Sequence, residues 1–164
     1  MRVPSIKSTI VKIGVGIFLP LLGFLGAYSQ SRTVNGLLFD PGMSPLWGIH
    51  IYINDSVKVG ETAAKGNYEI TIPVGVDSII FRGVGFEPLL VRLAPGCSRV
   101  EAIMISAGSY DFMSPAKVDR QRRRYIKKIS KLYPVAVQKG LFASDPPCYN
   151  RVFQPVASKM REMH

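Results

Sequence analysis

The sequence predicts a mainly β protein, an antiparallel β-sandwich followed by a basic helical extension. Residues 33–105 contain short runs in which apolar and polar side chains alternate, as in strands that are buried on one face. Turn-forming Gly, Pro, Asn and Asp residues separate these runs, and no helix-period segment interrupts them, which argues against a parallel α/β sheet. Residues 109–142 then change to a strongly basic pattern with helical spacing.

The alternating runs recur at the short spacing typical of an all-β sandwich. The clearest run places Ile49, Ile51 and Ile53 on one face and the polar His50 and Asn54 on the other. The other runs share this alternation or a continuous apolar core. The expected strands are 33–39, 49–55, 67–73, 77–83, 87–93 and 100–105.

Four short motifs follow one another along residues 33–106. They read "VNGLLFD", "SPLWGIHIYI", "VGETAAKGNYEITIP" and "FRGVGFEP". In this order they resemble the carboxypeptidase-regulatory-like domain, an Ig/transthyretin-like β-sandwich. One position departs from the family pattern, because Ala63 stands where an acidic residue usually follows the Thr of the Gly-x-Thr motif.

The resemblance implies a role without chemistry of its own. Domains of this family accompany carboxypeptidases but are not their catalytic part. They also stand at the front of outer-membrane TonB-dependent receptors, and they occur as short exported proteins. We therefore expect a non-catalytic module that acts in docking, binding or structural support in the bacterial cell envelope.

The N-terminus has the layout of a secretory signal peptide. Three basic residues precede an uncharged apolar run that ends in small residues, which predicts cleavage between Ser29 and Gln30. The alternative is a retained membrane anchor, because the uncharged run 13–31 is near the lower length limit for crossing a bilayer. Either way we expect an exported protein, in the periplasm or at the outer membrane. The expected segments are 1–29 (signal peptide), 30–108 (sandwich), 109–142 (basic helical extension) and 143–164 (tail).

Two cysteines, Cys97 and Cys148, lie in the part expected to be exported. In an oxidising compartment they can form a disulfide, whereas the alternative is two separately buried thiols. Sequence spacing does not decide between these alternatives, because pairing depends on three-dimensional geometry.

The extension is expected to begin at Ser114, since a Ser followed by Pro115 suits a helix N-cap and first turn. Pro134 should end or kink this helix, and a second short helix is expected from there to Phe142. The apolar residues at helical spacing should pack on the sandwich: Val118, Tyr125, Ile126, Ile129, Leu132 and Tyr133. The tail 143–164 is expected to be loosely ordered unless Cys148 holds it.

Charge is concentrated in the extension. Residues 30–108 carry six basic and seven acidic residues, whereas residues 109–164 carry twelve basic and four acidic ones. The basic cluster has three interpretations: an ordinary solvated helix face, a surface for an acidic envelope protein or an anionic membrane, or a nucleic-acid site, which export argues against. The candidate partner-binding residues are Arg120, Arg122, Arg123, Arg124, Lys127 and Lys128.

The sequence lacks the residue clusters on which most catalysis and cofactor binding depend. His50 and His164 are the only histidines, and neither has metal ligands at suitable spacing, so we expect no metal, no cofactor and no enzyme activity. Trp47 is expected to cover the sandwich edge. Its alternative role is to stack on a ligand, which would make the protein a periplasmic glycan- or peptide-binding module.

Overall fold

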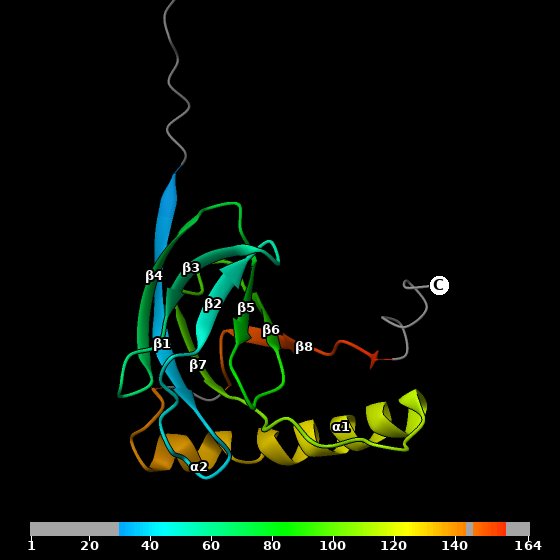
Figure 1. Ribbon diagram of the computed structural model, residues 1–164. Coiled ribbons are helices and arrows are strands. Elements are labelled where there is room, and N and C mark those ends of the chain that lie inside the picture. The colour runs from blue at the N-terminus through cyan, green and yellow to red at the C-terminus, as the bar shows by residue number, and fades with distance from the viewer. Residues whose placement is uncertain (1–29, 144–145, 157–164) are drawn as a thin grey trace, which may run out of the picture.

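A computed structural model describes residues 30–143 and 146–156, and Figure 1 shows two sheets packed face to face. The predicted signal peptide and residues 157–164 lie outside the described residues. One sheet has the strand order β4-β1-β7 and the other β3-β2-β5-β6-β8. The strands are β1 (Ser31–Phe39), β2 (His50–Ile53), β3 (Val57–Glu61), β4 (Asn67–Pro73), β5 (Ser78–Arg82), β6 (Leu89–Leu93), β7 (Arg99–Ile103) and β8 (Tyr149–Val152).

The predicted mainly β sandwich is confirmed. Apolar side chains from both sheets form one core, in which Val34, Ile51 and Phe81 are completely buried. Tyr68 of β4 and Phe81 of β5 join the two layers, with ring centroids 5.4 Å apart. All strand pairs are antiparallel except β1 and β7, which run parallel.

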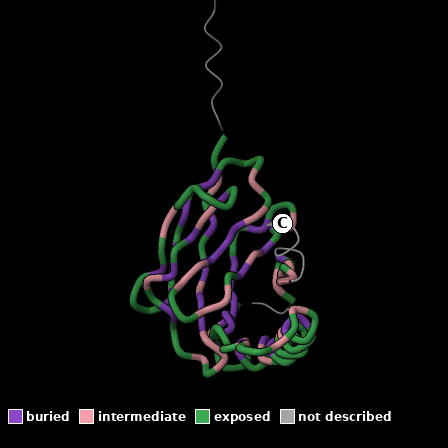
Figure 2. Tube along the Cα trace, turned by 45° about the vertical axis from the view of Figure 1, so that its right-hand side comes forward, coloured by how far each residue is buried: buried purple, intermediate pink, exposed green. Residues whose placement is uncertain are grey.

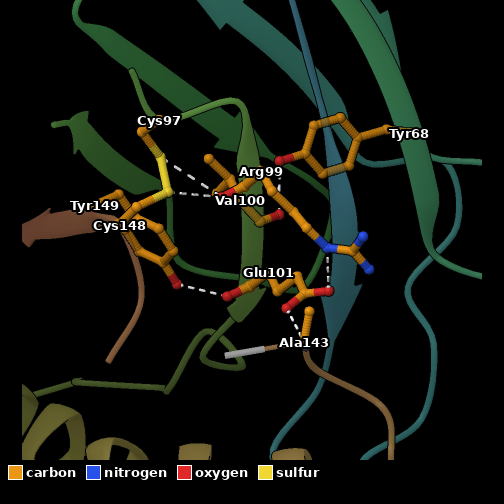
Figure 3. Close-up of polar contacts among 8 residues, drawn as sticks. All are labelled: Tyr68, Cys97, Arg99, Val100, Glu101, Ala143, Cys148 and Tyr149. Carbon is orange, nitrogen blue, oxygen red and sulfur yellow. Dashed lines mark hydrogen bonds and ion pairs between the residues drawn. A yellow bond between two sulfur atoms is a disulfide. The ribbon is translucent and has the colours of Figure 1, made fainter. Parts of the chain in front are cut away.

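The parallel pair depends on a glycine in β1. Gly36 lies beside Val100 of β7, and a Cβ atom added to Gly36 would stand only 1.8 Å from the Val100 carbonyl oxygen. The same carbonyl accepts a hydrogen bond of 2.8 Å from the Tyr68 hydroxyl (Figure 3). A side chain at position 36 would therefore disrupt both the strand pair and the buried hydrogen bond.

Two helices, α1 (Pro115–Ser130) and α2 (Tyr133–Gln138), lie across one end of the sandwich (Figure 1). The start of β1 lies at the opposite end. Helix α1 begins directly after Ser114, as predicted, although the Ser114 side chain makes no capping hydrogen bond. It ends at Ser130 because the ring of Pro134 is incompatible with a helical carbonyl four residues earlier.

The helical extension packs on the sandwich through an aromatic cluster. Phe142, after α2, has ring centroids 5.9 Å from Phe39 of β1 and 5.5 Å from Tyr133. The Tyr133 and Tyr149 hydroxyls are hydrogen-bonded at 2.6 Å, and the Tyr149 hydroxyl also donates to the Glu101 carbonyl oxygen at 2.8 Å. These buried rings link α2, β8 and β7.

Residues 149–152 are ordered, in the part of the chain that was expected to be loosely ordered unless Cys148 holds it. They form β8, the edge strand beside β6, so the sandwich continues beyond the boundary expected at residue 108. Cys148, directly before β8, forms a disulfide with Cys97, with Cα atoms 5.5 Å apart. The Cys148 carbonyl accepts a hydrogen bond of 3.0 Å from the Ala94 amide, which aligns the strand. Attachment through Cys148, the condition that the sequence left open, is thus met for this strand.

Among the described residues, no helix is long and apolar enough to cross a membrane.

Candidate functional site

The outward side of α1 presents a continuous row of cations. Lys117, Arg120, Arg124 and Lys127 recur at intervals of three and four residues, and Lys128 follows Lys127. All five are exposed, and we call them the outward basic face. Asp119 is the only acidic residue within α1, and it is buried. In the described part of the chain, none of these five cations forms a salt bridge. Figure 2 shows the outer side of the helical layer as exposed.

Arg122 does not belong to this face, which corrects its place among the candidate partner-binding residues. Its side chain is only 12% exposed and is turned toward the sandwich. Its Nε atom donates to Glu87 Oε2 at 2.8 Å, and Nη1 donates to the Gln154 carbonyl oxygen at 2.8 Å. A weaker contact of 3.5 Å joins Nη1 to Asp119 Oδ1. Arg122 therefore attaches the helix to the sandwich.

Glu87, just before β6, is the acceptor at the centre of this attachment. Besides the ion pair with Arg122, it accepts a hydrogen bond of 2.7 Å from the Tyr110 hydroxyl. Desolvation, together with the hydrogen bond to the Glu87 carboxylate and its charge, raises the pKa of Tyr110 to about 12. Tyr110 thus remains a neutral hydrogen-bond donor throughout the physiological pH range.

The segment after β8 holds the other side of the same helix. The Phe153 ring lies under the Arg123 guanidinium at 4.0 Å and near that of Arg122 at 5.1 Å, both within cation–π range. The Val156 amide donates to Asp119 Oδ1 at 2.9 Å. Arg123 is thus exposed, but its guanidinium stacks on the Phe153 ring. It lies between the outward basic face and the attached side, the side of α1 that contacts the sandwich and the segment after β8.

A second buried carboxylate connects the helical extension to β7. Glu101 accepts hydrogen bonds from Arg99 Nε at 2.7 Å and from the Ala143 amide at 2.6 Å (Figure 3). The Glu101 side chain is 6% exposed. Buried carboxylates that are paired in this way are usually structural, since both oxygens already have partners. The sequence showed only an isolated acidic residue in a strand, and its Ala143 partner is 42 residues away.

Trp47 does not cover the sandwich edge, and that expectation is wrong. The residue is 75% exposed, whereas its neighbour Leu46 is buried and fills the edge. The indole is therefore accessible to a ligand. Phe112, just before α1, is fully exposed, and Tyr125 within α1 is 39% exposed, although its helical spacing predicted that it packs on the sandwich.

His50 and Cys97 lie in surroundings that are ordinary for a strand surface and a disulfide. His50 is exposed on β2, with Nε2 3.7 Å from Glu61 Oε2 and Nδ1 3.4 Å from the Tyr52 hydroxyl. Cys97 forms the disulfide and so carries no free thiol. Among the described residues, no group of three His, Cys, Asp or Glu side chains is placed to hold a metal ion.

No protein-family model matches the chain, and no curated protein matches it. The functional interpretation therefore depends on the motifs of the sequence and on the geometry of the helix.

Proposed function

We propose that this protein is a non-catalytic docking module of the bacterial cell envelope, of carboxypeptidase-regulatory-like type, exported by its N-terminal segment. The outward basic face of α1 is its binding surface, and its partner carries negative charge. The four motifs along residues 33–106 support the family, and the layout of residues 1–29 supports export.

The proposal depends mainly on one observation: the inward and outward sides of α1 have different contacts. Attachment to the sandwich uses Arg122, Val118 and Ile129, which are turned inward. The outward basic face makes none of these attaching contacts, but the attachment fixes the direction in which this face points. Like charges on one helix face repel each other and add no stability to the fold, so they are better explained by binding.

Photo-crosslinking in cells tests the proposal. A photoreactive amino acid at position 124 should form adducts with envelope components, and the charge reversal Arg120→Glu should abolish them. The matched control is the same amino acid at exposed position 69 on β4, which should form few adducts. Equal yields at the two positions would contradict docking through α1. Whether the N-terminal segment is cleaved or retained does not change this comparison.

A second candidate function rests on Trp47. An indole that is 75% exposed on a loop can stack on a sugar ring or a peptide side chain, so the protein would be a periplasmic glycan- or peptide-binding module. Calorimetric titration with cell-wall glycans and peptides should then show saturable binding that Trp47→Ala removes. Binding that is unchanged in Trp47→Ala, or no binding at all, would count against this function.

A further inference from the structure

We infer that the partner of the outward basic face is an anionic lipid surface, to which the protein binds by charge without inserting α1. This inference deepens the proposed docking function and rests on it. The shared chemistry is a plane of negatively charged headgroups, and the source to which we commit is a phospholipid membrane.

The extent and uniformity of the face suit a membrane. From Lys117 to Lys128 the cations run along about 16 Å of helix at the usual rise per residue, with no exposed acidic residue among them in α1. A membrane offers negative charge in every direction, so cations with long flexible side chains can bind it without a fixed register. An acidic protein surface, in contrast, presents its charges at fixed positions, to which the cations would have to be matched one by one.

The packing of α1 excludes the usual way in which amphipathic helices bind membranes. Such a helix buries its apolar stripe among the lipid chains. Here Val118 and Ile129 are already buried against the protein, and the ion pair between Arg122 and Glu87 fixes the rotation of the helix. The apolar stripe is therefore unavailable, and α1 itself can meet the headgroups through its outward basic face.

An exposed aromatic residue adds a second indication of lipid. Phe112 is fully exposed at the N-terminal end of α1. Aromatic side chains are favoured at the boundary between headgroups and acyl chains. We expect Phe112 to make a minor, shallow contact and the cations to supply most of the binding.

Co-sedimentation of the full-length chain with vesicles tests the inference. The vesicles contain phosphatidylethanolamine with about a quarter phosphatidylglycerol, or phosphatidylcholine in place of the anionic lipid. Binding should require phosphatidylglycerol and should weaken as salt shortens the Debye length. The variant Arg120→Glu/Arg124→Glu should bind at least about thirtyfold more weakly, since each basic residue near the surface contributes appreciably and the new carboxylates repel the headgroups.

The matched control is Lys65→Glu/Arg92→Glu, which changes the net charge equally but at exposed positions outside α1. It should retain most of the binding, so net charge alone would not explain the loss. Because Arg120 and Arg124 form no salt bridge in the described part, their reversal should leave the melting temperature unchanged. Residues 1–29 are identical in all variants, so any contribution from them cancels in the comparison.

Two outcomes would overturn the lipid inference. One is binding that does not depend on phosphatidylglycerol, and the other is an equal loss in the test and control variants. If position 124 nevertheless crosslinks in cells to an envelope protein, docking survives and the partner is that acidic protein. If position 124 forms no adducts beyond those of position 69, the docking function itself fails.

Discussion

Arg122 and Arg124 stand two positions apart in α1 and have opposite surroundings. Arg122 lies against the sandwich, paired with Glu87 and the Gln154 carbonyl oxygen, whereas Arg124 is exposed and forms no salt bridge among the described residues. Two steps along an α-helix turn a side chain by about 200°, which accounts for the contrast. Basic residues that are clustered in the sequence therefore do not form one surface. Their positions around the helix axis determine which of them contact the sandwich and which are exposed.

The largest loss of stability is expected when the disulfide, which holds β8 and the segment that contacts α1, is removed. The double substitution Cys97→Ser/Cys148→Ser should lower the free energy of unfolding by about 4 kcal/mol in the chain-entropy model, because the bond closes a loop with a sequence separation of 51. It also frees β8, whose continuation packs on Arg123 and Asp119. Guanidinium denaturation followed by circular dichroism measures the loss. Wild-type protein should become equally unstable in a reductant, whereas the variant should not respond to one.

Substitution of Arg122 tests the attachment itself. Arg122→Ala should lower the free energy of unfolding by about 3 kcal/mol, since it leaves the Glu87 carboxylate nearly buried without its cation. Adding Glu87→Gln to this variant should recover part of the loss, which a double-mutant cycle would measure as coupling between the two residues. Losses that simply add would mean that the ion pair does not hold the helix.

Alkaline pH should weaken the attached side. Burial raises the pKa of Tyr68 and Tyr149 well above 10, and the pKa of Tyr110 is raised to about 12. The folded state therefore holds these protons more tightly than the unfolded state, so stability is complete below pH 10 and falls as the pH rises through about 12. Denaturation midpoints measured across that interval should decrease. Tyr110→Phe should make the decrease smaller, and an unchanged slope would contradict the assignment.

The smallest effect on stability is expected for the outward basic face. Arg124→Ala should change the free energy of unfolding by no more than about 0.5 kcal/mol, as is usual for surface substitutions away from special features. Thermal melting beside Arg122→Ala makes the comparison direct. A loss as large as that of Arg122→Ala would show that the outward face is structural and would remove the basis of the docking proposal.

Local pattern was sufficient to predict the strands that form the core. The alternation of Ile51 and Ile53 with polar neighbours identified β2, and the other predicted strands each contain at least one apolar residue that the structure buries. Strand β3 was missed, because its alternation covers only Val57 to Val59 and none of its residues is fully buried. Its place is set instead by pairing with β2.

The rest of the site depends on contacts between distant residues. Strand β8 is short, and Tyr149 is buried only because Cys148 and the Glu101 carbonyl oxygen hold it against the sheet. Arg122 stands four residues after the buried Val118 and four before Ile126, so helix phase alone could have placed it inward. Its partner Glu87, 35 residues away, could not have been found in this way.

The exposure of Trp47 also determines how the folding of this protein can be observed. It is the only tryptophan in the chain, and it is already in contact with water in the folded state. Its fluorescence emission should therefore change little on unfolding, and an assay based on it would report a stable or a denatured sample almost alike. The buried phenols of Tyr68, Tyr133 and Tyr149 lie in fixed, asymmetric surroundings, so near-ultraviolet circular dichroism of tyrosine is the optical signal that follows the core.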